Sequence, residues 1–341
     1  MAFRAAVAGI VALCLLAGVA SFAGQLPGAL AALSAADPSL LALAAGAEVL
    51  SYTLIATTFG RLTGPGKRVS GWLAGRTAIV AYGLGNILPG SPAPGITLAM
   101  MDLRRRGMAA RHRNLAMAWT AWFLVSGFLG IAGAAAVLAA ARGHIPEQHE
   151  AVVLGVASFV LAMVVVTTLL AAHPRPLEWG AMFVGRSRWG GAVADDDVRM
   201  TGQHWHSDAM QALGGFWNRQ GVAAAAAASW LADAVCLAIA LRAVGVTVDF
   251  DIILLGYVAA ILASAIPFLP GGAGAVEAAL PAVLHHYGVP LEAGIAGTLA
   301  WRAMALLLPA AVGALVLLGP HGFRWCMARA GRAEPGALTA D

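Results

Sequence analysis

Long apolar runs restrict most what this 341-residue chain can fold into. Each carries at most one charge and reaches or approaches the roughly 20 residues that a helix needs to cross a bilayer. The runs are residues 5–24, 39–60, 114–141, 151–172, 220–241 and 290–301, the last continuing as 303–318. Charged residues make up only 11% of the chain, against roughly 25% in soluble domains. The sequence therefore predicts an all-α polytopic membrane protein with about six full spans, and it excludes disordered, secreted soluble and nucleic-acid-binding proteins.

The basic residues sort by side of the membrane. With the N-terminus placed inside, eighteen of the 21 lysines and arginines fall in cytoplasmic segments, the exceptions being Arg142, Arg242 and Arg302. Most tryptophans lie in or beside the same segments. This asymmetry is expected of a protein in a bacterial-type plasma (inner) membrane with both termini cytoplasmic. Residues 1–24 also fit a cleavable signal peptide, which would leave the rest of the topology unchanged.

Two apolar segments are interrupted. The first, residues 69–106, breaks at the proline- and glycine-rich stretch 89–95, and basic residues flank both of its ends. The second breaks at 267–274, and its neighbours are acidic or neutral. A segment that starts and finishes on one side must turn back, and broken backbone is tolerated in the membrane only where protein or water lines it. The sequence predicts two re-entrant helical hairpins that open to opposite sides.

The two breaks match each other at an offset of 181 residues. Eight of the 39 positions from 69 to 107 are identical to those 181 residues later, including Leu-Pro-Gly at 88–90 and 269–271 and the pair Gly107 and Gly288. We interpret this as an inverted-topology repeat, in which transporters often form a midplane site from broken helices. Two proline kinks in ordinary helices are the alternative.

The repeat divides a single transmembrane domain into parts. Repeat A covers about 39–141 and repeat B about 220–318, and the span 151–172 between them turns the second copy over. A cytoplasmic amphipathic loop is expected at 173–219 and a cytoplasmic tail at 319–341.

Four charged side chains are expected inside the membrane, where each costs on the order of 3 kcal/mol even on a lenient scale. Glu48 and Asp233 hold comparable places in the two halves, Glu277 lies in the returning arm of the second hairpin, and Arg302 lies in the last span. Arg302 is the only clearly intramembrane cation, so we expect it to pair with at least one acid. These four are candidate substrate-binding residues, because an arginine fork can hold a phosphate or carboxylate and an acid can exchange a proton. A buried structural ion pair is the alternative.

Glycines at the breaks are candidates for the wall of the same site. Helix starts after glycine-rich turns carry unpaired N–H groups that favour an anion, and glycine lets a headgroup approach the backbone. Simple turning of the chain is the alternative. The candidates are Gly90, Gly95, Gly271, Gly272 and Gly274.

The polar segment 173–219 is expected to lie on the anionic inner leaflet, because tryptophans and arginines are interspersed along it. The acidic run from Asp195 to Asp197 could indicate a metal-diphosphate site, but the spaced acidic motif of prenyl-chain enzymes is absent. A metal site is also not expected at His204, His206 and Asp208, because the sequence offers no further ligand beside them. No phosphate-binding loop, dinucleotide fingerprint or nucleophile elbow is present, so we expect no cofactor and no metal.

The second break resembles a known family. Residues 270–277 follow the pattern Pro-Gly-Gly-x-Gly-x-x-Glu, and Gly288 and the pair Trp301-Arg302 come after them. This pattern resembles the flippase-like transmembrane domain of lysylphosphatidylglycerol synthases. Asn86 and the Leu-Pro-Gly at 88–90 look like the same family's first-half motif. The resemblance covers nearly the whole chain and implies three further site candidates: Asn86, Pro89 and Pro270.

In the best-known members of that family, the domain moves an aminoacylated phospholipid across the membrane after a separate soluble domain has made it. This sequence ends at Asp341, so the resemblance implies a stand-alone relative without the aminoacyltransferase domain. The sequence departs from the family's pattern early in the third span, where Trp119 and Thr120 replace an expected charged pair. We therefore do not carry the family's substrate contacts over to the first repeat.

These observations predict a lipid translocator rather than an enzyme. Its substrate would be a membrane lipid with an anionic or aminoacylated headgroup, or a polyprenyl-linked lipid, and the acyl tails would stay in the bilayer. Expected partners are anionic lipid at the cytoplasmic face, a second copy of the chain, or a lipid-synthesis enzyme. The alternatives are a membrane-embedded transferase acting on a lipid-linked substrate and a non-catalytic accessory subunit of a lipid-synthesis complex.

Overall fold

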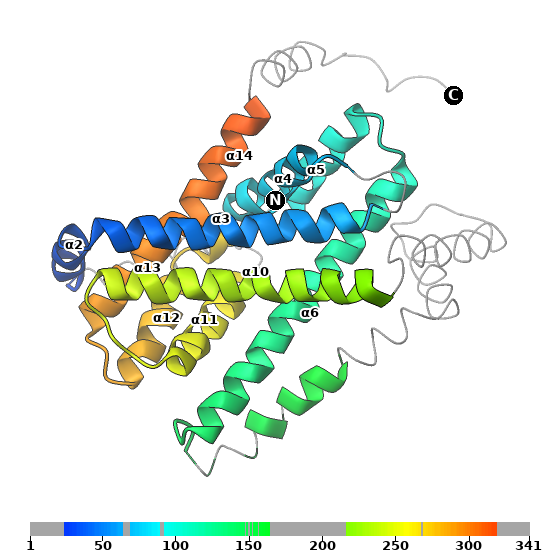
Figure 1. The fold of residues 1–341 in the computed structure, drawn as a ribbon. Coiled ribbons are helices and arrows are strands. Elements are labelled where there is room, and N and C mark those ends of the chain that lie inside the picture. Colours follow the sequence, from blue (N-terminus) through cyan, green and yellow to red (C-terminus); the bar gives the residue numbers. More distant parts are fainter. Residues whose placement is uncertain are drawn as a thin grey trace, which may run out of the picture.

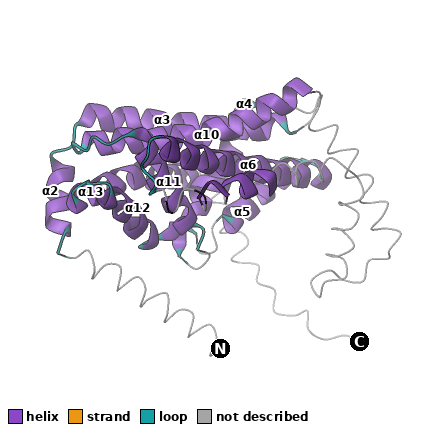
Figure 2. Ribbon diagram, turned by 90° about the horizontal axis from the view of Figure 1, so that it is seen from below, coloured by secondary structure: helices purple, strands orange, loops and turns teal. Residues whose placement is uncertain are grey.

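The structure is a computed structural model that describes residues 24–63, 69–88, 92–146, 216–266 and 269–318, with some positions between 148 and 163. Every regular element in these ranges is a helix (Figures 1 and 2). The first half contains α2 (Leu26–Ser34), α3 (Pro38–Arg61), α4 (Gly71–Ala78), η1 (Ile79–Leu84), η2 (Gly85–Ile87), α5 (Ala93–Arg105) and α6 (Ala110–Ala141). The second contains α10 (Phe216–Ala243), α11 (Phe250–Ser264), η3 (Pro270–Gly272), α12 (Ala275–His286), α13 (Leu291–Arg302), η4 (Ala303–Leu307) and α14 (Leu308–Leu318).

Four described helices are long and apolar enough to cross a membrane. They are Pro38–Arg61, His112–Ala141, Asn218–Ala243 and Leu291–Leu317, and they correspond to the spans predicted at 39–60, 114–141, 220–241 and 290–318. Helices α6 and α10 begin four residues earlier than predicted, because backbone hydrogen bonds continue a helix through polar residues beyond the apolar layer. The predicted span 5–24 and the tail 319–341 lie outside the described residues, as do residues 173–215 of the predicted loop.

The helices of the two halves begin and end at matching positions. Helices α5 and α12 end at Arg105 and His286, and α6 and α13 begin at Ala110 and Leu291; both pairs are 181 residues apart. The order of elements is also the same: a long helix, two shorter helices separated by a break, and a second long helix. The offset found between the two breaks therefore also relates helix ends beyond the breaks.

The ends of α5 and α12 share one turn geometry. Gly107 and Gly288 have φ angles of 80° and 89°, which glycine adopts without the steric cost of a side chain. In each turn a backbone N–H reaches back across the glycine, from Met108 to Leu103 O at 3.1 Å and from Val289 to Leu284 O at 3.0 Å. This is the Schellman motif. The matched glycines in the sequence therefore end two equivalent helices.

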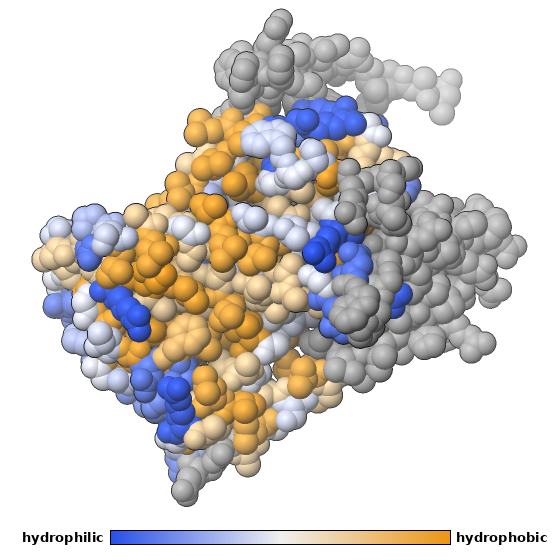
Figure 3. Space-filling view, in the orientation of Figure 1, coloured by the Kyte–Doolittle hydropathy of each residue, from blue (hydrophilic) through white to orange (hydrophobic). Residues whose placement is uncertain are grey.

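Helices α3 and α10 run antiparallel and side by side (Figure 1). The backbone N–H of Asp37, just before α3, donates to Ala243 O at the end of α10 at 2.9 Å. Figure 3 shows apolar side chains across the face that these helices present, with hydrophilic residues toward its ends. On α3, Leu43, Val49 and Leu50 are more than half exposed. An exposed apolar band of this kind fits the lipid-facing surface of a multi-pass membrane protein.

Candidate functional site

The break between α11 and α12 is built from three glycines. Gly271, Gly272 and Gly274 have φ angles of 57°, 68° and 82°, and other residues adopt this region only at a cost. The break also lies close to the neighbouring chain, since a Cβ on Gly271 would be 2.9 Å from the carbonyl oxygen of Asn86 in η2. The structure thus brings the predicted site residues Asn86 and Gly271 together. Pro89 and Gly90 lie outside the described residues.

Glu277 joins the start of α12 to Arg302. Its Oε2 accepts a hydrogen bond from the backbone N–H of Gly274 at 2.7 Å, and its Oε1 accepts one from Arg302 Nε at 2.9 Å. This arrangement corrects the expectation that the N–H groups after the break are unpaired, because a side-chain carboxylate already occupies that of Gly274. A carboxylate in the first turn of a helix is also favoured by the helix dipole.

Arg302 is only partly used by this ion pair. Its side chain is 13% exposed, and Nε makes the bond to Glu277. No hydrogen bond joins Nη1 or Nη2 to another described residue. Arg302 ends α13 where the chain passes into the π-helical turn η4, a type of irregularity that often occurs at functional sites. The guanidinium therefore keeps two nitrogens available for a further acceptor.

Asp233, on α10, is held by two aromatic side chains. Tyr257 OH donates to Oδ2 at 2.8 Å, and Trp301 Nε1 donates to Oδ1 at 2.7 Å. The two rings pack edge to face with centroids 5.9 Å apart, and both side chains are buried. Trp301 precedes Arg302, so neighbouring residues of α13 bind the two acids Asp233 and Glu277.

Glu48, on α3, completes the group. Its buried side chain lies against the carboxyl group of Asp233 across the interface between α3 and α10. Two ionised carboxylates repel each other and have no donor, so this contact is favourable when one of the two groups carries a proton and donates it to the other. Among the described residues, no hydrogen-bond partner reaches the buried Glu48 Oε2. One arginine, three acids and two aromatic residues thus form a group that we call the polar cluster: Glu48, Asp233, Tyr257, Glu277, Trp301 and Arg302.

A comparison with protein families matches residues 4–313 to the transmembrane region of lysylphosphatidylglycerol synthases. The chain belongs to this family. The match confirms the resemblance found in the motifs around 86–90 and 270–302, and it covers both halves of the structure. A search of curated proteins finds no match. Membership in the lysylphosphatidylglycerol synthase transmembrane family connects the chain to membrane lipids.

In this member of the family, the four predicted intramembrane charges all belong to the polar cluster. Arg302 pairs with Glu277, while the carboxyl groups of Glu48 and Asp233 lie against each other. Sequence reasoning missed Tyr257 and Trp301 as partners of Asp233. The available signal was a pair of aromatic residues with polar atoms inside apolar segments, since a buried Tyr hydroxyl or Trp N–H usually requires a hydrogen-bond partner.

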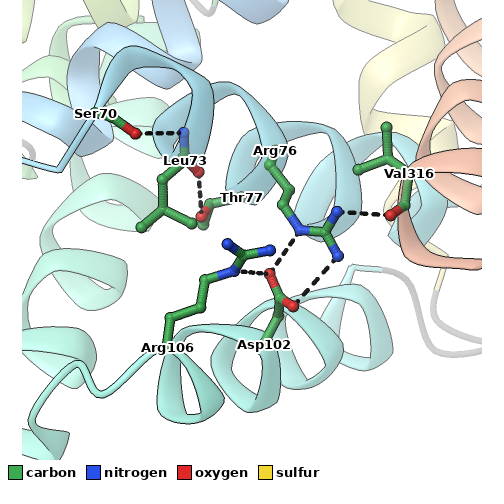
Figure 4. A network of polar contacts seen from close by, with 7 residues as sticks. All are labelled: Ser70, Leu73, Arg76, Thr77, Asp102, Arg106 and Val316. Atoms are coloured by element: carbon green, nitrogen blue, oxygen red, sulfur yellow. Dashed lines mark hydrogen bonds and ion pairs between the residues drawn. The ribbon is translucent and has the colours of Figure 1, made fainter. Parts of the chain in front are cut away.

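A second polar network joins α4, α5 and α14 (Figure 4). Arg76 on α4 binds Asp102 on α5 through Nε at 2.7 Å and Nη2 at 3.3 Å, and its Nη1 donates to Val316 O on α14 at 2.6 Å. Arg106 Nε also donates to Asp102, at 3.2 Å. Every nitrogen of the Arg76 guanidinium therefore has a protein partner. Among the described residues, no group of three or more His, Cys, Asp or Glu side chains is placed to hold a metal ion.

Proposed function

We propose that this protein moves a lipid with an anionic or aminoacylated headgroup, or a polyprenyl-linked lipid, between the leaflets of the membrane, and that it is not an enzyme. The observation that carries the proposal is that Nη1 and Nη2 of Arg302 form no hydrogen bond with any described residue. A guanidinium held in a mostly apolar bundle with these two nitrogens available is suited to bind two oxygens of a phosphate or carboxylate.

The same proposal includes the topology. The two broken segments are re-entrant hairpins of an inverted repeat within six full spans, and both termini are cytoplasmic in a bacterial-type inner membrane. Three observations support it: the common offset of the helices, the equivalent turns at Gly107 and Gly288, and the contact between Asn86 and Gly271 at the two breaks. In this arrangement the headgroup passes between the breaks while the acyl tails remain in the bilayer.

The polar cluster offers complementary charges to such a headgroup. A lipid phosphate would bind Nη1 and Nη2 of Arg302 while Glu277 continues to hold Nε. The ammonium group of an aminoacylated headgroup would be attracted to the acidic pair of Glu48 and Asp233, whose Glu48 Oε2 lacks a partner. Both contacts are made inside the bundle, where opposite charges attract more strongly than in water.

The test is transbilayer movement in liposomes that contain the purified protein. The lipids would be labelled phosphatidylglycerol, its aminoacylated forms and a polyprenyl phosphate. We expect movement of at least one lipid, and its loss in Arg302→Ala and in Glu277→Gln, which removes the acceptor that orients Arg302. Movement that persists in both folded variants would contradict the proposed role of the pair. Absence of movement for every lipid would count against translocation and favour an accessory or enzymatic role.

A further inference from the structure

We propose that a pocket at the end of α3 is a second lipid site, which binds the phosphodiester of an anionic phospholipid whose headgroup carries hydroxyl groups. The pocket has a volume of about 520 Å³ and lies between α3, α4 and the beginning of α10. Its polar lining includes Thr53, Thr57, Arg61 and Asn218, and its apolar wall includes Ala56 and Val69. None of these residues belongs to the polar cluster.

Arg61 supplies the positive charge of the pocket. It is the last residue of α3 and is exposed, and no hydrogen bond or ion pair joins it to another described residue. Its guanidinium rests against the bare backbone of Gly221 on α10, where an added Cβ would overlap Nη1. The first turn of α4, which includes Gly71, also lines the pocket and brings the positive end of a helix dipole. A phosphate is the natural counter-ion for this combination.

The threonines define the rest of the headgroup. The hydroxyl of Thr53 already donates to Val49 O at 2.7 Å, and that of Thr57 donates to Thr53 O at 2.8 Å. Each hydroxyl oxygen can therefore only accept a further hydrogen bond, so it is suited to a ligand that donates one. A headgroup with free hydroxyls beside its phosphate offers both an anion for Arg61 and donors for the threonine oxygens, whereas a choline headgroup offers no such donor.

The position of the pocket fits a membrane lipid. Trp72, next to Gly71, is 68% exposed, as expected of a tryptophan at the headgroup layer. From Arg61 to Thr53 the pocket follows α3 for eight residues, or about 12 Å at 1.5 Å per residue. Thr53 is five residues from Glu48 on α3, so along the helix axis the inner end of the pocket is about 7.5 Å from the level of Glu48. If the proposed function holds, the pocket is where a lipid waits before its headgroup reaches Arg302; binding in the pocket does not depend on that function.

The experiment measures lipid binding to the purified full chain in nanodiscs of neutral phosphatidylcholine, with labelled phosphatidylglycerol added. We expect Arg61→Gln to weaken binding about tenfold, the loss typical of a charge-assisted contact. Gly221→Ala keeps the charge but displaces the guanidinium, and we expect it to weaken binding several-fold. Arg104→Gln is the matched control, because Arg104 is an exposed arginine in the last turn of α5 that does not line the pocket; it should change binding less than twofold.

Two further measurements distinguish a bound lipid from bound inorganic phosphate, and the pocket from the polar cluster. Competition by millimolar inorganic phosphate that also depends on Arg61 would identify the ligand as the phosphate group itself, and failure to compete would assign the site to the lipid. Arg302→Ala should keep this binding. Equal effects of Arg61→Gln and Arg104→Gln, or loss of binding in Arg302→Ala, would overturn the second site. If the proposed function alone is wrong, lipid binding at Arg61 remains while wild-type protein moves no lipid.

Discussion

Arg76 in the first half and Arg302 in the second half are buried to the same degree, yet they are used differently. Both side chains are 13% exposed and each is paired with a carboxylate, Asp102 or Glu277. Arg76 has all three guanidinium nitrogens bound to protein atoms, whereas Arg302 has only Nε bound among the described residues. All guanidinium nitrogens of Arg76 are therefore used to join three helices, while Arg302 can still bind a ligand.

The positions equivalent to the polar cluster show the same division. At the offset of 181, Arg302 corresponds to Ala121, Glu277 to Ile96, and Asp233 to Tyr52. The turns at Gly107 and Gly288 are nevertheless the same in both halves. The two halves thus share their backbone framework, while the charged chemistry lies in the second half with Glu48 contributed across the interface from α3.

The largest effect on stability is expected from Asp233→Ala. It leaves the Tyr257 hydroxyl and the Trp301 N–H buried without an acceptor, which should destabilise the protein by about 2–4 kcal/mol. Reversible unfolding in mixed detergent micelles measures this. Thr120→Val, which removes a buried hydroxyl of the first half that donates to Ala116 O, is the control and should cost under about 1 kcal/mol. Similar losses for the two variants would mean that the second half has no special polar core.

Asp102→Ala tests the first-half network. Arg76 would keep its bond to Val316 O but lose its carboxylate, so we expect a loss of about 1–3 kcal/mol in stability. Lipid movement per folded molecule should stay within about twofold of wild type, because Asp102 binds Arg76 and Arg106 and does not belong to the polar cluster. A loss of movement in well-folded Asp102→Ala protein would show that the first half shares in transport.

Glu48 offers a test of the shared proton. Glu48→Gln can donate an amide N–H to Asp233 and should change stability by less than about 0.5 kcal/mol, whereas Glu48→Ala loses the hydrogen bond and should cost about 1–2 kcal/mol. Unfolding of the two variants under the same conditions makes the comparison. If glutamine is as destabilising as alanine, the contact between the carboxyl groups does not involve a shared proton.

Equal effects are expected at the two equivalent turns. No atom lies within 4 Å of a Cβ added to Gly107 or Gly288, so alanine at either position costs only backbone strain, about 1–2 kcal/mol. The two losses in the free energy of unfolding should agree within about 0.5 kcal/mol. A clear difference between them would weaken the structural equivalence of the halves.

Much of the framework could be predicted from sequence, because apolar length and charge asymmetry respond directly to the bilayer. Four spans were predicted within a few residues, and the offset of 181 anticipated equivalent turns at Gly107 and Gly288. The π-helical turns η1 and η4 were not predicted, since η1 contains only the single glycine Gly83 and η4 contains neither glycine nor proline. Packing between helices determines where these two turns form.

The sequence predicted which charged residues form the site, but not which of them contact each other. An intramembrane charge is conspicuous in sequence, so Glu48, Asp233, Glu277 and Arg302 were identified. Which acid meets which partner depends on how α3, α10 and α13 face one another, and an apolar helix with small residues on all sides does not show this. The saturation of Arg76 by a carbonyl on α14 is a contact across 240 residues that the sequence does not reveal.

The most direct test compares Arg302→Gln with Arg76→Gln in the liposome assay, with both proteins matched for folded amount. The account predicts that Arg302→Gln loses lipid movement by at least about tenfold, because the donors for the headgroup are removed. It predicts that Arg76→Gln lowers stability while movement per folded molecule stays within about twofold of wild type. Equal losses of movement in the two variants, or normal movement in Arg302→Gln, would contradict the claim that the second half binds the lipid headgroup.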